Sequence, residues 1–215
     1  QFGSGNQEIP RITFPEGLSV SQIFTLLEEN HICHVSDLKE AARLYLDAYL
    51  KPGSALTAPY YLLPAAVYPE EKMPVRAFPK WKNHVFHGAT NVHLSQAWAL
   101  AQAAELLDDE EALGLVQNQL EWTLGRNPFS SSLMYGVGYN FAPNFAYCTR
   151  NITGAIPVGI DCLHDDQPFW DGSAHATSHE IWIEPVSRFL GTLSLYVKHG
   201  AGLKIRNVRI LDLGE

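Results

Sequence analysis

Long apolar runs, positive charge and cysteine are all scarce in this chain of 215 residues. No apolar run approaches the roughly 18 residues that span a membrane, which argues against a membrane partner. The formal net charge is −8 and no basic patch stands out, which argues against nucleic acid as the main partner. The three cysteines, Cys33, Cys148 and Cys162, have no metal-binding spacing, and their odd number implies no disulfide framework.

The sequence does contain enough apolar material for one globular domain with a real core. Hydrophobic residues make up 46% of the chain, a share typical of soluble proteins. Aromatic residues make up 11%, and five of them are Trp. Sugar-binding clefts use such rings as platforms, but buried cores use them too, and composition alone favours the core. The chain does not begin with Met and has no signal peptide, which fits a mature product or a fragment.

Apolar residues at helical spacing predict a nearly all-α protein whose helices form antiparallel pairs. The pair Asp108 and Asp109 should separate the third helix from the fourth, and Pro128 should stop the fourth after Gly125. The expected helices cover residues 19–29, 36–50, 91–107, 110–125 and 185–198.

Short local signals set the expected boundaries in the first third of the chain. The run Ser-Val-Ser-Gln at 19–22 has the capping-box pattern, and Ser36 is expected to cap the second helix. The run Lys-Pro-Gly at 51–53 should end that helix. Six prolines between residues 52 and 90 then predict long loops with one short helix near 56–67.

Two further segments do not have a helical pattern. Residues 126–178 form a long Gly- and Pro-rich connection, and a connection of that length inside a compact domain is usually functional. Residues 203–213 alternate apolar and polar side chains and predict one β-strand, which must pair with something because a lone strand is not stable. We therefore divide the chain into a helical region, 1–200, and a C-terminal strand or tail, 201–215.

Four short motifs follow one another along the chain. They read His-Gly-Ala-Thr-Asn at 87–91, Leu-Gly-Arg-Asn-Pro at 124–128, Tyr-Gly-Val-Gly-Tyr at 135–139 and His-Glu-Ile-Trp at 179–182. Together, over residues 88–197, they resemble the C-terminal half of the catalytic domain of glycoside hydrolase family 9, the cellulase-type inverting glycosidases. The resemblance implies part of an all-α (α/α)6 barrel, whose complete form has about twice as many helices as predicted here. The expected protein partner is therefore the missing N-terminal half of the domain or another chain, which would cover apolar surface left open.

The resemblance also implies roles for individual residues. Glu180 falls on the family's general acid, which protonates the leaving oxygen of a glycosidic bond while an Asp activates water. The family's Asp pair has no matching motif here, so the base is expected in the missing half. The substrate class is a poly- or oligosaccharide, and a secreted or periplasmic location is expected rather than a cytoplasmic one. The candidate substrate-binding residues are Arg150, Tyr135, Tyr139, Trp182, His87 and Glu184.

The sequence departs from the family in two places. Where the family often has His-His-Arg, residues 143–149 read Pro-Asn-Phe-Ala-Tyr-Cys-Thr, and only Arg150 matches. The Asp-Tyr-Asn that follows the family's acid is Glu-Pro-Val at 184–186. These departures favour a second hypothesis, a non-catalytic carbohydrate-binding or structural helical module.

The residues around Glu180 provide an independent argument. Because Pro185 suits the first turn of a helix, residues 178–184 are expected to be extended, with Glu180, Trp182 and Glu184 on one face. Trp182 lowers the local polarity and Glu184 repels a second negative charge, and both effects favour the protonated carboxyl that a general acid needs. The nearby helix N-terminus favours the charged form instead, and from spacing alone a cap or ion pair at the helix start is the commoner role.

Metal ligands are the remaining candidates. His175, His179 and Glu180 do not follow the zinc-protease order, and Gly172 and Pro185 disfavour the helix that would align them. We therefore assign no metal to the site and expect no required cofactor. A structural calcium ion stays open, although a solvated acidic loop is the commoner explanation for its candidate ligands, Asp161, Asp165, Asp166 and Asp171.

Overall fold

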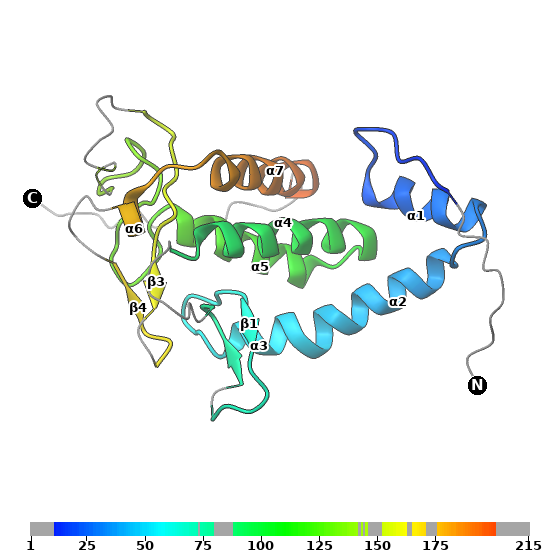
Figure 1. Ribbon diagram of the computed structural model, residues 1–215, viewed down its shortest axis with the longest axis horizontal. Helices are drawn as coiled ribbons and strands as arrows, with labels where there is room; N and C mark the ends of the chain where they lie inside the picture. Colours follow the sequence, from blue (N-terminus) through cyan, green and yellow to red (C-terminus); the bar gives the residue numbers. More distant parts are fainter. Residues whose placement is uncertain are drawn as a thin grey trace, which may run out of the picture.

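The computed structural model describes residues 11–72, 74–79, 88–141, 143, 145, 152–162, 165–170 and 176–200 (Figure 1). This part of the chain is mostly helical, as the sequence predicts. None of its helices is both long enough and apolar enough to pass through a membrane. Five of them have ten or more residues: α1 (Val20–Glu29), α2 (Val35–Tyr45), α4 (Thr90–Leu107), α5 (Glu110–Thr123) and α7 (Ile183–Gly200).

The shorter elements lie between these helices. A π-helical turn, η1 (Leu46–Leu50), and a short helix, α3 (Lys51–Ala55), continue α2, and α6 (Ala176–His179) precedes α7. Two antiparallel hairpins pair β1 (Ala66–Val67) with β2 (Val75–Arg76), and β3 (Asp161–Cys162) with β4 (Pro168–Phe169). The strand predicted at 203–213 lies outside the described residues.

Helix α4 is the centre of the packing. Figure 1 shows α4, α5 and α7 side by side, and both neighbours pack against α4. The Ala-rich sequence of α4 suits this position, because Ala97, Ala101 and Ala104 are buried and let neighbouring backbones approach. This confirms the helix predicted at 91–107, whereas the complete barrel implied by the resemblance remains a prediction.

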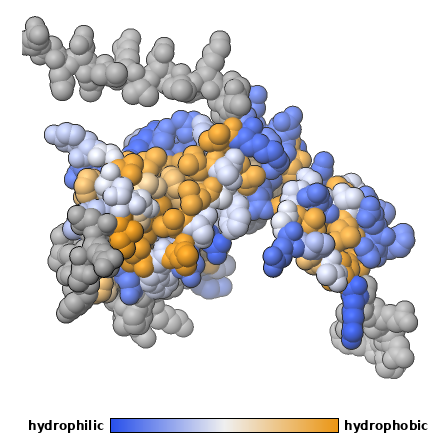
Figure 2. Space-filling view, turned by 90° about the horizontal axis from the view of Figure 1, so that it is seen from above, coloured by the Kyte–Doolittle hydropathy of each residue, from blue (hydrophilic) through white to orange (hydrophobic). Residues whose placement is uncertain are grey.

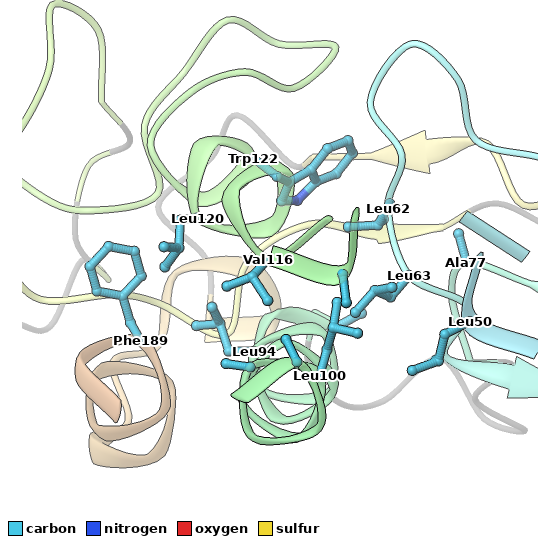
Figure 3. Close-up of a cluster of buried hydrophobic side chains, with 14 of the residues drawn as sticks. Leu50, Leu62, Leu63, Ala77, Leu94, Leu100, Val116, Leu120, Trp122 and Phe189 are labelled. Carbon is cyan, nitrogen blue, oxygen red and sulfur yellow. The ribbon is translucent and has the colours of Figure 1, made fainter. Parts of the chain in front are cut away.

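The hydrophobic core fills the space between α4, α5, α7 and the loop before β1. Burial of one Val, Leu, Ile, Phe or Met side chain stabilises the fold by roughly 1.5–3 kcal/mol. Trp122 is one of the buried core residues, so at least this Trp serves the core. Figure 3 shows the core side chains Leu50, Leu62, Leu63, Ala77, Leu94, Leu100, Val116, Leu120, Trp122 and Phe189.

The turn between α4 and α5 confirms the predicted break at the two aspartates. Asp108 takes a left-handed conformation with φ of 53°, which ends α4. Asp109 then caps α5, because its Oδ1 accepts a hydrogen bond from the backbone N–H of Ala112 at 2.9 Å. Lys51 Nζ lies 3.1 Å from Asp109 Oδ2 and 2.8 Å from Glu111 Oε2, so α3 is joined to the start of α5.

The first helix has the predicted capping box. The Ser19 N–H donates to Gln22 Oε1 at 2.8 Å, and the Gln22 N–H donates to Ser19 Oγ at 3.3 Å. Helix α1 nevertheless contains no buried residue. Its apolar side chains are at most half-buried, so packing stabilises α1 less than it stabilises α4 or α5.

The predicted boundaries of the second helix were wrong at both ends. The helix begins after His34, which makes no side-chain cap, and Ser36 lies inside the first turn. Residues 51–53 do not end it, because the wider η1 turn accommodates the missing N–H of Pro52 and lets the chain continue into α3. The π turn also shifts the helix face, so Leu46 and Leu50 are buried while Tyr45 is exposed.

The segment after α3 also differs from the prediction. No helix forms over residues 56–67: residues 56–60 make turns and β1 follows at Ala66–Val67. Gly53 explains the close packing here, because an added Cβ would clash with the Pro64 ring.

His93 on α4 is a buried histidine that joins α4 to the segment after β2. Its Nε2 lies 2.6 Å from the Ala77 carbonyl oxygen, and since a carbonyl only accepts, Nε2 carries the proton. The ring meets the edge of Phe78 at 5.0 Å between centroids. Complete burial lowers the pKa of His93 to about 4, and the hydrogen bond to Ala77 opposes this only in part.

This lowered pKa predicts a loss of stability in mild acid. The unfolded chain takes up the proton near the ordinary histidine pKa of about 6.5, before the folded chain does. Stability should therefore be complete above about pH 6.5 and fall by up to roughly 3 kcal/mol as the pH approaches 4. Denaturant unfolding at several pH values measures this. His93→Gln should flatten the dependence, whereas His34→Gln, at an exposed histidine, should not; equal slopes in all three proteins would contradict the assignment.

Candidate active site

The candidate site is organised by a buried segment at residues 155–160, which reads Ala-Ile-Pro-Val-Gly-Ile. All six residues are buried although they form no helix or named strand. The segment supplies the start of α4 with hydrogen-bond acceptors: the Ala89 N–H donates to Ile160 O at 2.7 Å, and the Thr90 N–H donates to Val158 O at 3.0 Å. These carbonyls replace the side-chain cap that Ala89 lacks.

Two glycines let the segment come this close to α4. A Cβ on Gly88 would clash with the carbonyl oxygen of Gly159, and a Cβ on Gly159 would clash with Thr90 Oγ1. Gly159 also has a φ of +82°, which favours glycine. The motif at 87–91 thus contains a glycine that this backbone contact requires.

The same segment holds the residues next to Glu180. The Val158 N–H donates to Glu180 O at 2.9 Å, the Gly159 N–H donates to Ser178 O at 3.0 Å, and Pro157 forms a β-bridge with Ile181. These hydrogen bonds therefore hold the backbone at Glu180 against the buried segment.

The Gly-x-Gly loop reaches the segment from a third direction. The Tyr135 N–H donates to Ala155 O and the Gly154 N–H donates to Tyr135 O, both at 2.9 Å. Three of the motifs found in the sequence thus meet on residues 154–160. The sequence analysis missed this segment, although the apolar run after Gly154 and before Asp161 was a usable signal for a buried strand-like stretch.

Glu180 lies in a short connection between α6 and α7. Its N–H donates to Ala176 O at 3.1 Å, and its side chain is half-exposed. The expectation that residues 178–184 are extended was wrong at both ends, because α6 includes residues 178 and 179 and α7 begins at Ile183. Pro185 lies in the first turn of α7 as predicted.

His179, next to Glu180, is buried and fully engaged. The Trp170 indole N–H donates to His179 Nε2 at 2.9 Å. Since an indole nitrogen only donates, Nε2 is unprotonated and Nδ1 donates to the Pro143 carbonyl oxygen at 2.8 Å. Both ring nitrogens are therefore used to hold Trp170 and Pro143, which disfavours a metal ion at His179. His175 lies outside the described residues.

The acidic residues proposed for calcium have structural contacts where they are described. Asp166 accepts hydrogen bonds from the Ala77 and Phe78 N–H groups at 2.8 and 3.1 Å and lies 3.5 Å from buried Arg76. Burial raises the pKa of Asp166, and these partners oppose the rise. Among the described residues, no three His, Cys, Asp or Glu side chains cluster as metal ligands would. Asp171 lies outside them, so a calcium ion remains a prediction.

The predicted substrate-binding residues differ in how far they are exposed to solvent. Tyr135 is half-buried against Phe141, with 5.1 Å between ring centroids, whereas Tyr139 is fully exposed. Trp182 is half-exposed and Glu184 is exposed in the first turn of α7. His87 and Arg150 lie outside the described residues.

Two cavities occur elsewhere in the described chain. One of about 250 Å3 lies between the start of α1, α4 and α7, and one of about 310 Å3 lies along α1. Neither is lined by a predicted site residue. A substrate cleft beside Glu180 therefore remains a prediction.

Asn127 explains the Gly-Arg-Asn-Pro motif in structural terms. This buried side chain donates to Trp122 O at 2.9 Å and to Ser131 O at 2.8 Å, and accepts from the Phe129 N–H at 3.1 Å. It therefore ties the end of α5 to the loop that leads to Tyr135.

Comparisons with known proteins are sparse. No protein-family model matches the chain, and no curated protein matches it significantly. A crystal structure of the cellulase Cel9M of C. cellulolyticium in complex with cellobiose is similar to part of it, with 19% sequence identity and a TM-score of 0.45. The match covers 52% of this chain and 29% of that chain. A likeness of this size does not show a family, so family 9 remains a resemblance.

Replacement of Asn127 should destabilise the loop and the end of α5 together. Asn127→Ala leaves one buried and two part-buried backbone groups without these hydrogen bonds, so we expect a loss of about 2–3 kcal/mol in unfolding free energy. Asn140→Ala is the matched control, because this exposed residue makes one side-chain hydrogen bond, to Ser130 O. Its loss should stay below about 1 kcal/mol. Equal losses in denaturant titrations would show that Asn127 has no special role.

Proposed function

We propose that this chain is a glycoside hydrolase-like domain that acts on a poly- or oligosaccharide by inverting hydrolysis, with Glu180 as general acid. One observation carries the proposal. Glu180 offers a half-exposed carboxyl group from a backbone that is hydrogen-bonded to the buried segment 155–160, where the start of α4 and the Tyr135 loop also meet. A general acid needs such a fixed position within hydrogen-bond reach of the leaving oxygen.

The candidate substrate-binding residues suit roles in binding sugar. Trp182 and the tyrosines Tyr135 and Tyr139 carry flat faces on which a pyranose can stack. Glu184 and Arg150 can accept from and donate to sugar hydroxyls, and His87 precedes the Gly88 contact at the start of α4. In this proposal the aromatic rings orient the sugar, and Glu180 supplies the proton to the departing oxygen.

The base completes the reaction. In an inverting enzyme the second carboxylate lies about 6.5–9.5 Å from the acid and activates a water on the opposite face of the sugar. The resemblance assigns this base to an N-terminal half of the domain that the present chain lacks. We therefore expect little or no hydrolysis by these 215 residues alone.

The second candidate is a carbohydrate-binding or structural helical module without turnover. The absence of His-His-Arg in the sequence before Arg150 favours it. Asn127 and His179 also serve structural contacts, so two motifs of the resemblance have an explanation without catalysis.

Glu180→Gln is the decisive variant. It keeps the size and much of the hydrogen bonding of the side chain but removes the proton that can be donated. In an active polypeptide that contains this chain, we expect turnover of natural substrate to fall by roughly 100-fold or more. Aryl glycosides with acidic phenols need no protonation of the leaving group, so their loss should be smaller.

Glu184→Gln is the matched control, because this exposed carboxylate lies in the first turn of α7 and should change turnover less. Equal losses on natural and activated substrates would assign Glu180 another role. Oligosaccharide binding without turnover in every complete polypeptide would favour the second candidate. Robust hydrolysis by these residues alone would place a base among them, with Asp161, Asp165, Asp166 and Asp171 the first to test.

A further inference from the structure

The residue before the candidate acid lies in surroundings unlike those of the acid itself. Figure 2, which views the molecule from the side of α7, shows apolar side chains gathered on this face, so the hydropathy of the surface does not single out a carboxylate. Glu180 is half-exposed three residues before α7 begins, whereas His179 is only 1% exposed. What sets the position of Glu180 therefore has to be sought in the hydrogen bonds beneath the surface.

His179 is attached to distant parts of the chain by three hydrogen bonds. Its Nδ1 donates to the Pro143 carbonyl oxygen at 2.8 Å, and its own carbonyl oxygen accepts from the Phe145 N–H at 3.2 Å. On the other edge of the ring, the Trp170 indole N–H donates to Nε2 at 2.9 Å. One buried residue therefore links two further segments to the position that precedes Glu180.

We propose that His179 is a positioning residue for Glu180, which it holds where the carboxyl group can meet the leaving oxygen. The inference rests on the proposed function, because it assigns a role in the same reaction. The Val158 N–H already holds the Glu180 carbonyl oxygen from the buried segment 155–160. His179 adds bonds to two other parts of the chain, so three separate segments support the connection before α7. A general acid needs such support, because a misplacement of about 1 Å can lower turnover about 100-fold.

A neutral imidazole suits the two contacts of the ring. The carbonyl of Pro143 only accepts and the indole of Trp170 only donates, so one ring nitrogen has to carry a proton and the other has to lack one. The two bonds thus fix both the tautomer and the orientation of the ring. The amide of an Asn could replace Nδ1 alone and that of a Gln could replace Nε2 alone, because the two side chains differ in reach by one methylene group.

Trp170 is itself held in place. Its ring packs against the core and meets Phe129 edge to face, with 6.0 Å between the ring centroids. The Phe129 N–H in turn donates to Asn127 Oδ1 at 3.1 Å, in the turn that follows α5. The support of His179 therefore extends to the end of α5 rather than ending in a loop.

Three variants of His179 test the proposal in an active polypeptide that contains this chain. A misplaced acid slows natural substrate, whose leaving oxygen needs a proton, more than it slows aryl glycosides with acidic phenols, whereas a loss of folded protein slows both equally. We therefore expect His179→Ala to lower kcat on natural substrate at least about fivefold more than on the activated one. His179→Asn and His179→Gln, which each keep one ring contact, should restore part of this difference.

A milder variant serves if His179→Ala does not fold. Trp170→Phe removes the indole N–H but keeps an aromatic ring, and it should shift the ratio of the two rates in the same direction by about two- to fivefold. The matched control is Trp98→Phe, at a half-buried Trp that packs on Gly191, and it should leave the ratio unchanged. His93→Ala is the control for loss of a buried histidine, because it should lower stability without changing the ratio.

Amide hydrogen exchange of the 215-residue chain gives a readout that does not need activity. The Val158 N–H donates to the Glu180 carbonyl oxygen, so its exchange reports how firmly the backbone of Glu180 is held. If His179 supports Glu180, Trp170→Phe should speed this exchange by about threefold or more relative to the amides of α5. Trp98→Phe should not do so.

Equal losses on the two substrates in the His179 and Trp170 variants would overturn the positioning role, and so would unchanged exchange at Val158. Glu180→Gln separates this inference from the proposed function. If Glu180→Gln leaves turnover of natural substrate unchanged, the proposed function is wrong and the positioning role falls with it. If Glu180→Gln lowers turnover while the ratio stays constant in the His179 variants, only the positioning role is wrong.

Discussion

The close approach of two backbones at Gly88 and Gly159 is the contact on which the rest of the described structure depends. It allows the carbonyls of Val158 and Ile160 to accept hydrogen bonds from the start of α4, the central helix of the core. The same segment also forms backbone hydrogen bonds with the residues around Glu180 and with the loop at Tyr135. A methyl group at either glycine would therefore disturb the core and the candidate site at once, because both pack against the same segment.

The helices were predictable where a local signal decides the backbone. The capping box at Ser19 and Gln22 and the turn at Asp108 and Asp109 depend on hydrogen bonds between residues at most three apart, so the sequence alone shows them. The continuation through Pro52 could not be predicted in the same way. It depends on the burial of Leu46 and Leu50 in a core built from α4 and α5, and that burial outweighs the usual effect of a proline.

The candidate site was predictable only in its parts. Resemblance singles out Glu180 and the glycine motifs, but the contacts that bring them together join residues far apart in the chain. The Asp166 carboxylate binds backbone N–H groups 88 and 89 residues away, and His179 bonds to Pro143 across 36 residues. A single sequence carries no signal for such pairs, so neither the backbone contacts of Asp166 nor the hydrogen bonds of His179 could be predicted.

Helix α1 differs from the helices of the body in what keeps it folded. It has a complete capping box but no buried side chain, and Figure 1 shows it at the end of the molecule away from α6. Since a helix of ten residues is marginal in water by itself, α1 also needs its contacts with α2 and α4. A cut in the turn at residues 30–34 would therefore release a segment that loses its helical state, whereas the packing of α5 and α7 against α4 does not depend on it.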